Sequence, residues 1–170
     1  MQTLEQIIAQ IQPLNQDAMV KAQVKLDGLL KPTGSLGRLE TLAIQLAGIF
    51  GEKNVNVNRK QIVVMAADHG VYDEGVAISP RVVTAIQAQN MIHGVTGVCV
   101  LAKHAGAEVV IVDAGIDCEP IEGAVDMRMA RGSGNIAREA AMSREQAEFL
   151  LTKAADFAMT QAANGVRLLG

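Results

Sequence analysis

The sequence predicts an α/β protein with a doubly wound parallel sheet, preceded by a helical segment. Residues 3–51 carry apolar side chains at the spacing of amphipathic helices. Residues 61–67 and 108–112 are continuously apolar and rich in β-branched side chains, a pattern typical of parallel strands buried on both faces. Helical patterns lie between these runs, and strand–helix–strand order indicates parallel pairing through crossover connections.

The first 51 residues predict three helices. In the first, apolar residues recur three and four positions apart until Pro13 ends the pattern. We expect the second helix over residues 15–30 and the third over residues 36–50. Residues 31–35 interrupt them, because the residue before a proline disfavours helical backbone angles.

Both expected strands end in polar and glycine-rich residues. Asp68-His69-Gly70 follows the first strand, and Asp113-Ala114-Gly115 follows the second. Ligands bind to open α/β sheets at the carboxyl ends of the strands, which meet at one edge. We therefore expect these two polar segments on the same rim.

Three further helices and one more strand complete the pattern. Ser79 is expected to cap a helix over residues 80–91, and another helix covers residues 97–104. A capping box opens the helix over residues 143–163. A strand pattern over residues 166–169 has no helix after it, so the sheet is expected to be incomplete.

Composition excludes several classes of protein. With 170 residues, 49% hydrophobic and 19% charged, the chain suits one globular domain and not a disordered chain. It has one tyrosine, three phenylalanines and no tryptophan, which disfavours modules that stack nucleic-acid bases on aromatic rings. The net charge of -3 also disfavours binding to a phosphate backbone, so we expect no nucleic-acid partner.

The cellular compartment is predicted from cysteines and apolar runs. Cys99 and Cys118 are too few for a disulfide framework and are expected to be incidental thiols in a reducing compartment. The N-terminus lacks the basic region of a signal peptide. The longest apolar runs fall well short of the ~20 residues of a membrane-spanning helix. We expect a cytoplasmic protein with no membrane partner.

Asp68 and His69 are the sharpest local candidates for chemistry. A carboxylate beside an imidazole at a strand end can serve acid–base or metal chemistry. A hydrogen-bonded pair that shapes the loop explains the two residues equally well. No metal is expected, because the spacing of the available ligands matches no compact motif. Those ligands are Asp68, His69, His93, His104, Asp113 and Cys118.

Two glycine-rich stretches and one polar pair are weaker signals. Residues 34–37 and 132–135 could present backbone N–H groups to an anion, although ordinary turns are the more frequent explanation. Ser79 and Gln87 lie eight residues apart, a little over two helical turns, which predicts both on one helix face. The alternative is a helix cap and an exposed glutamine.

Several segments together resemble one enzyme family. They follow in order over nearly the whole chain, and several are too long for chance matches. They are KPTGSLGRLE at 31–40, VMAADHGV at 64–71, EGVAISP at 74–80, VT at 83–84, GAEV at 106–109, VDAGI at 112–116, RGSGNI at 131–136 and AMS at 141–143. These segments resemble nicotinate-nucleotide–dimethylbenzimidazole phosphoribosyltransferase, of cobalamin lower-ligand assembly.

The resemblance implies an activity and a fold. The enzyme would move the phosphoribosyl group of nicotinate mononucleotide to 5,6-dimethylbenzimidazole, with inversion at the anomeric carbon and without a metal or cofactor. The products would be α-ribazole 5′-phosphate and nicotinate. The implied protein is a homodimer with a small helical domain drawn from both chain ends. Residues 1–52 would belong to that small domain, and residues 53–170 to the first part of the α/β domain.

The resemblance also implies site residues. Ser79 and Gln87 match positions that line the benzimidazole pocket. Asp68 and His69 match the strand-end loop near the active cleft, and residues 132–135 are expected to reach that cleft.

Two departures from the family concern loops. Thr33 stands where a proline is common, and residues 138–143 carry charge in the loop before the long helix.

The largest departure is length, because the family runs to about twice this chain. The general-base glutamate and most phosphate contacts of the family match nothing before Gly170. We therefore expect weak or no turnover from this chain, since loss of a general base costs ~10²–10⁴-fold in rate. The alternative is a non-catalytic benzimidazole-binding or assembly fragment. A metal-dependent hydrolase that uses Asp68 and His69 is disfavoured.

Overall fold

The computed structural model describes residues 2–52 and 55–170. These residues form two compact units, Ala9–Val57 and Met1–Ile8 with Asn58–Gly170. The predicted boundary between residues 52 and 53 touches Lys53, which lies outside the described residues. The division into a small helical domain and an α/β domain therefore stays a prediction.

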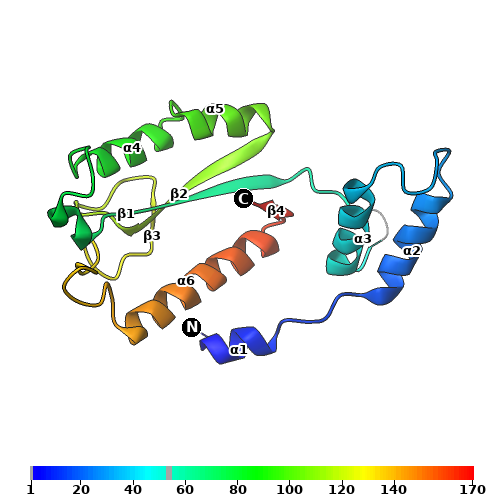
Figure 1. Cartoon of the computed structure of the whole chain (residues 1–170), viewed down its shortest axis with the longest axis horizontal. Helices are drawn as coiled ribbons and strands as arrows, with labels where there is room; N and C mark the ends of the chain where they lie inside the picture. Colours follow the sequence, from blue (N-terminus) through cyan, green and yellow to red (C-terminus); the bar gives the residue numbers. More distant parts are fainter. Residues whose placement is uncertain (1, 53–54) are drawn as a thin grey trace. The chain divides into compact units, whose positions relative to one another are not determined.

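The Ala9–Val57 unit is a helical pair, α2 (Gln16–Asp27) and α3 (Arg38–Phe50), seen in Figure 1. The Asn15 side chain caps α2 by accepting a hydrogen bond from the backbone N–H of Ala18, at 2.9 Å. The helices pack closely, because a Cβ on Gly48 would lie only 2.7 Å from the Met19 side chain. Two helices of this unit are thus confirmed, with ends a few residues inside the expected ones.

A buried ion pair closes the loop between α2 and α3. Lys31 Nζ lies 2.7 Å from Glu40 Oε1, and the same oxygen accepts a hydrogen bond from the Leu36 N–H at 3.0 Å. The hydrogen bond from Lys31 is the largest cause that lowers the pKa of Glu40. The N–H groups of Ser35 and Gly37 donate to carbonyls within the loop. The glycine stretch at 34–37 is therefore a turn with its own hydrogen bonds.

The other unit contains a four-stranded parallel sheet with strand order β3-β2-β1-β4. Its centre is the pair β1 (Lys60–Ala67) and β2 (Ala107–Gly115), whose register begins with Lys60 opposite Ala107. β3 (Val125–Asp126) and β4 (Leu168–Leu169) are two-residue edge strands. The short helix α1 (Leu4–Ala9) has no buried residue.

The crossover helices make this sheet doubly wound. α4 (Val83–Ile92) and α5 (Gly97–His104) connect β1 to β2, whereas α6 (Arg144–Ala163) carries the chain from β3 back to β4 beside β1. Figure 1 shows α4 and α5 along one side of the strands and α6 along the other. Right-handed crossovers that run in opposite directions place their helices on opposite faces. The strand order therefore reverses between β1 and β4, which is where α/β sheets bind ligands.

The core of this unit is aliphatic, as the scarcity of aromatic residues requires. Ala88 on α4 packs with Ile111 on β2 and Ile116 just beyond it, all at most 3% exposed. Burying side chains of the size of isoleucine contributes roughly 1.5–3 kcal/mol each. The α4 face is thereby fixed against the strands whose ends form the rim.

The α4 and β2 expectations for this unit are wrong in detail, and one strand was not expected. α4 begins at Val83, because the Val83 N–H donates to Pro80 O at 3.0 Å in a preceding turn. Ser79 therefore lies in a loop and caps no helix. β2 runs through Gly115, because its last residues pair with the end of β1. β3 is absent from the expected elements, since a two-residue strand has no periodicity to detect.

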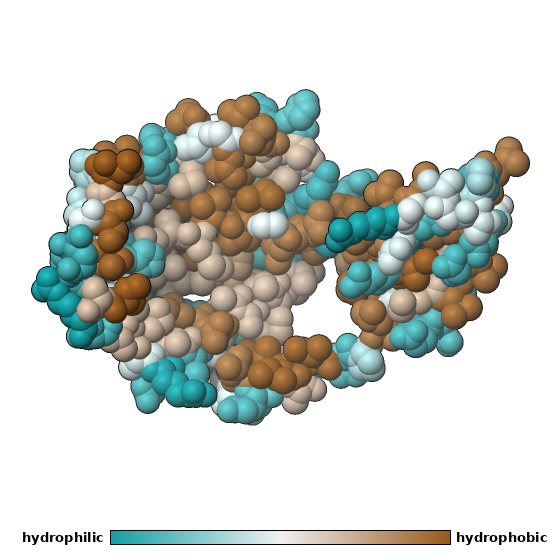
Figure 2. Space-filling view, viewed as in Figure 1, coloured by the Kyte–Doolittle hydropathy of each residue, from teal (hydrophilic) through white to brown (hydrophobic). Residues whose placement is uncertain are grey.

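Large apolar side chains also reach the surface of the α/β unit. Figure 2 shows apolar residues over the face that α4 and α5 form. Those exposed there include Ile86, Val95, Val100 and Leu101. Among the described residues, no helix combines the length and apolar character that crossing a membrane requires.

Candidate functional site

The carboxyl ends of β1 and β2 meet at one rim, as the sequence predicts. Ala66 pairs with Asp113 at the end of the two strands, and the Asp68 N–H donates to Gly115 O at 3.0 Å. The two polar segments that follow the strands are therefore neighbours. This rim is the candidate site.

Asp68 ties three segments of the rim together. Its carboxylate accepts a 2.7 Å hydrogen bond from Thr84 Oγ1 on α4 and a 2.8 Å bond from the Asp117 N–H after β2. The residue is 7% exposed. Because its two carboxylate oxygens each hold a different segment, Asp68 shapes the rim. Its side-chain bonds run to Thr84 and Asp117, not to His69 as a simple Asp–His pair would require.

His69 is joined to Ser133 through both backbone and side chain. The two residues form a parallel bridge, with the Ser133 N–H donating to Asp68 O and the Gly70 N–H donating to Ser133 O, each at 3.1 Å. His69 Nδ1 lies 3.4 Å from Ser133 Oγ. The His69 side chain remains exposed. The loop that contains Ser133 thus becomes an extension of the strand end.

Two glycines permit this close approach. A Cβ on Gly70 would lie 2.7 Å from the backbone N of Asn135, and a Cβ on Gly134 would lie 2.6 Å from Ala140 O. The neighbouring atoms are backbone atoms, which cannot move aside as a flexible side chain would. The N–H groups of Gly132, Ser133 and Gly134 all donate within the protein. This stretch is therefore a docked turn, and those N–H groups are not available to an anion.

Two clefts share this rim. The larger, about 430 Å³, lies between the 132–134 turn and the start of α6, including Ser143 and Gln146. The smaller, about 280 Å³, lies between the loop after β1 and the start of α4. Residues 67–69 line both clefts. Of the stretch at 132–135, Gly132, Ser133 and Gly134 line the larger cleft beside Asp68 and His69.

Of the two residues Ser79 and Gln87, only Ser79 lines a cleft of the rim. Ser79 lines the smaller cleft together with Asp68 and His69. Val83 and Thr84 also line it from α4, and Gln87 lies one turn further along the same helix. Gln87 is exposed and is not among the residues that line the cleft. The sequence predicts both residues on one face of a helix. This prediction is wrong, because Ser79 lies before the first residue of α4.

Arg81 organises the outer wall of the smaller cleft. Its guanidinium binds Asp73 at 2.9 Å and Asp117 at 3.2 Å, and its Cζ lies 4.7 Å from the centre of the Tyr72 ring. Asp117 in turn donates its N–H to Asp68. No pattern in the sequence signals this arrangement, because its members come from separate segments of the chain.

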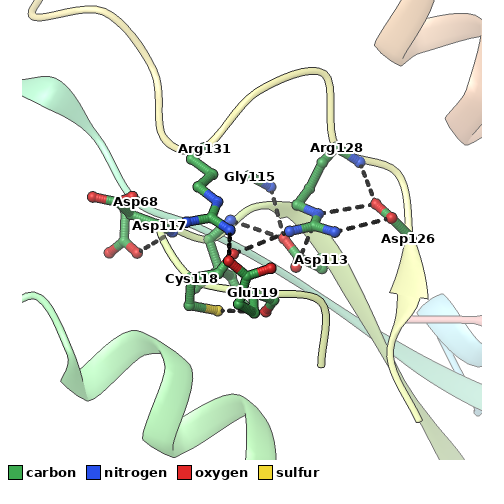
Figure 3. Close-up of polar contacts among 10 residues, drawn as sticks. Asp68, Asp113, Gly115, Asp117, Cys118, Glu119, Asp126, Arg128 and Arg131 are labelled. Atoms are coloured by element: carbon green, nitrogen blue, oxygen red, sulfur yellow. Dashed lines mark hydrogen bonds and ion pairs between the residues drawn. The ribbon is translucent and has the colours of Figure 1, made fainter. Parts of the chain in front are cut away.

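A second arginine supports the carboxyl end of β2, as Figure 3 shows. Arg128 binds the Asp126 carboxylate, with Nη2 3.1 Å from Oδ2, and its Nε lies 3.4 Å from Asp113 Oδ2. Hydrogen bonds from Arg128 lower the pKa of Asp126 to about 2. The other Asp113 oxygen accepts from the N–H groups of Gly115 and Ile116. Neither aspartate is therefore a free carboxylate at the rim.

The candidate metal ligands named in the sequence lie at separate places in the α/β unit. Residues 2–52 and 55–170 contain no group of three or more His, Cys, Asp or Glu side chains arranged to hold a metal ion. His104 ends α5, next to the strand starts and away from the rim. Burial is the largest cause that raises the pKa of the Cys118 thiol.

Comparisons with known proteins agree with this fold. A phosphoribosyltransferase family model matches residues 11–170. Nicotinate-nucleotide–dimethylbenzimidazole phosphoribosyltransferase of Yersinia enterocolitica is 65% identical over 170 residues, covering all of this chain and 48% of that protein. The protein of the same name from Photorhabdus laumondii is 59% identical, with 49% of its length covered.

A solved structure shows the same fold. It is the nicotinate-nucleotide–dimethylbenzimidazole phosphoribosyltransferase of Thermus thermophilus, with a TM-score of 0.84 and 32% identity. The match covers 92% of this chain and 48% of that one. The chain spans about half the length of the curated relatives it matches. On this evidence the chain belongs to the phosphoribosyltransferase family whose model it matches from residue 11 to residue 170.

Proposed function

We propose that this chain carries the benzimidazole subsite and part of the nucleotide subsite of a phosphoribosyltransferase. The reaction moves phosphoribose from nicotinate mononucleotide to 5,6-dimethylbenzimidazole and yields α-ribazole 5′-phosphate and nicotinate. The observation that carries the proposal is the pair of clefts that share residues 67–69 at the end of β1, beside which the strand order reverses. A group-transfer enzyme needs two such neighbouring subsites.

The smaller cleft suits a flat, mostly apolar base. Its walls include Val71, Val76 and Val83, and Ser79 offers a hydroxyl at its edge. Small-molecule sites combine apolar walls with a few polar groups in this way. Gln87, one turn along α4 from Val83, would add an amide contact at the open end.

The larger cleft suits the nucleotide. It is lined by the first turn of α6, a 20-residue helix whose N-terminus favours an anion such as a phosphate. Its volume of about 430 Å³ falls in the range of roughly 300–1,000 Å³ common for such sites.

The chemistry then follows from the two subsites. A ring nitrogen of the benzimidazole attacks the anomeric carbon from the face opposite nicotinate, and the bond from that carbon to the nicotinate nitrogen breaks with its electron pair. The benzimidazole N–H proton passes to a general base, which in the resembled family is a glutamate. At this rim Asp68 is 7% exposed and held by two hydrogen bonds, and we propose binding of both substrates with slow turnover at most.

Titration calorimetry and mass spectrometry test the proposal. The purified chain is titrated with dimethylbenzimidazole and with nicotinate mononucleotide, and mixtures are analysed for ribazole phosphate. We expect binding of both ligands, and weaker benzimidazole binding in Ser79→Ala and Gln87→Ala. Absence of both binding events at millimolar ligand would refute the proposal. Binding with no product would favour a non-catalytic binding or assembly role.

We further propose a homodimer in the cytoplasm, as the resemblance implies. The exposed apolar residues of α4 and α5 support self-association, because large apolar patches mark interaction sites. Light scattering of the purified protein would give a dimer mass, and a monomer at micromolar concentration would contradict it.

A further inference from the structure

Among the described residues that line both clefts, His69 is the one with an exposed side chain, whereas Asp68 is buried. Ala67 is apolar, and both Asp68 oxygens already accept hydrogen bonds. His69 is exposed, and no hydrogen bond from Nε2 to any described residue is found. His69 is therefore the exposed polar side chain available to a ligand that occupies both clefts.

The hydrogen bonds of Ser133 indicate which ring nitrogen carries the proton. The Ser133 hydroxyl donates its hydrogen to Gly134 O at 3.1 Å, so toward His69 it acts as an acceptor. In that arrangement His69 Nδ1 is the N–H donor to Ser133 Oγ, and in this tautomer of the ring Nε2 holds a lone pair. The backbone bridge between the two residues holds this arrangement in place. Nε2 is thus a hydrogen-bond acceptor at the junction.

The transferred group identifies the ligand atom. In the proposed reaction the phosphoribosyl group is bonded first to nicotinate and then to benzimidazole, so its ribose must lie between the two subsites. A ribose carries hydroxyl groups, which donate hydrogen bonds. We propose that His69 binds a ribose hydroxyl of the phosphoribosyl donor through Nε2, with Ser133 as the positioning residue. This inference rests on the proposed function.

Three single variants separate this role from a structural one. His69→Asn keeps a nitrogen near the Nδ1 position and can still bond Ser133, but it lacks any atom at Nε2. His69→Gln restores an acceptor near the Nε2 position. His104→Asn is the matched control, since His104 is an exposed histidine beside the opposite ends of the strands.

Calorimetry with nicotinate mononucleotide and with dimethylbenzimidazole is the main measurement. We expect His69→Asn to weaken nucleotide binding ~3- to 10-fold, the worth of one hydrogen bond, and to leave benzimidazole binding unchanged. His69→Gln should recover part of the loss, and His104→Asn should bind as wild type does. Removing the contacted hydroxyl from the nucleotide (2′-deoxy or 3′-deoxy) should weaken wild-type binding by a similar factor, with no further loss in His69→Asn.

Nuclear magnetic resonance of the wild-type protein gives an independent readout. The chain has three histidines, so their ring signals are assignable with the single variants. Nicotinate mononucleotide should shift the ring signals of His69 and leave those of His104 in place.

Each outcome bears on a definite claim. Wild-type binding of both ligands, with unchanged nucleotide affinity in His69→Asn, overturns the role of His69 and leaves the proposed function standing. Equal loss of benzimidazole and nucleotide binding in His69→Asn, or an unshifted His69 signal, also overturns it. If the wild type binds neither ligand, the proposed function and this inference both fail.

Discussion

Single residues hold the rim together through partners that are distant in the sequence. The Asp68 carboxylate joins Thr84 and Asp117, and Gly70 lies directly beneath the backbone of the 133–135 turn. None of these partners is within ten residues of Asp68 or Gly70 in the chain. The geometry of the site thus depends on contacts whose loss can be measured one residue at a time.

Substitution of Gly70 is expected to disturb the rim. In Gly70→Ala the new Cβ would lie 2.7–2.8 Å from backbone atoms of residues 133–135, so one segment must move. Overpacking of this kind costs roughly 1–3 kcal/mol of unfolding free energy. Urea denaturation followed by circular dichroism measures it.

The matched control for Gly70→Ala is Gly97→Ala. Gly97 is the first residue of α5, and a Cβ there would meet no atom within 4 Å. Alanine in place of a helical glycine should leave stability unchanged or raise it by up to about 1 kcal/mol. Equal stability of the Gly70→Ala variant and the wild type would contradict the close approach.

The Asp126–Arg128 pair predicts a pH dependence of stability. The pKa of Asp126 falls from its ordinary 3.8 to about 2 in the folded protein, chiefly because Arg128 donates hydrogen bonds to it. A lowered folded-state pKa stabilises the protein above the unfolded value and loses that effect as the pH falls through the folded one. The stabilisation is therefore full above about pH 5 and disappears between about pH 4 and pH 2.

Comparison of Asp126→Asn with wild type over this pH range tests the pair. The Asp126 side chain is 59% exposed, so we expect solvent screening to limit the difference at pH 7 to under about 1 kcal/mol. The difference should shrink toward zero near pH 2. Glu108→Gln, which removes an exposed carboxylate of β2, is the matched control for the loss of one negative charge. A difference that grows as the pH falls would refute the assignment.

At the scale of elements, α6 links the sheet to the larger cleft. Ser143 Oγ accepts from the Gln146 N–H at 3.2 Å, and Gln146 Oε1 accepts from the Ser143 N–H at 2.8 Å. This reciprocal capping box fixes the first turn of the helix, which lines the cleft.

Removal of the α6 cap is expected to fray the first helical turn. Ser143→Ala loses the acceptor for the Gln146 N–H and should lower stability by about 1 kcal/mol. Amide hydrogen exchange of Gln146 should accelerate while that of residues near Thr152 stays slow. Ser143→Asp keeps a capping oxygen and should retain wild-type exchange at Gln146. Unchanged exchange in Ser143→Ala would show that the cap contributes nothing.

Across the whole molecule, stability is expected to be uneven. The paired strands β1 and β2 carry the most extensive register and contribute the buried residues Ile111 and Val112, whereas α1 buries no residue. The free energy of local unfolding is small for segments that make few tertiary contacts.

Hydrogen exchange with mass spectrometry measures this ranking. Peptides from residues 60–67 and 107–115 should exchange slowest, and peptides from residues 4–9 should exchange within the shortest labelling time. Equally slow exchange in α1 and in the central strands would contradict this ranking, because α1 has no buried residue.

Much of the fold was predictable because its signals are local. The apolar run at 61–67, the capping box at Ser143 and the break at Pro32 are each set by a few neighbouring residues. The start of α4 was predicted three residues early because Ser79-Pro80 has the form of a helix start, yet Pro80 accepts a turn hydrogen bond from Val83. Short strands such as β3 exist only through pairing with β2, which no local pattern encodes.

The sequence by itself determined the fold class, the rim that bears Asp68 and His69, and the family. Periodicity and strand–helix order are properties of neighbouring residues, and long motifs are recognisable as strings. Only the tertiary structure decided which atoms of the rim residues stay free. Hydrogen bonds across 16 and 49 positions occupy the Asp68 carboxylate, and the docking of Ser133 leaves His69 between two clefts. The physical reason is that a side chain's free atoms depend on which distant groups the folded chain brings within hydrogen-bond reach.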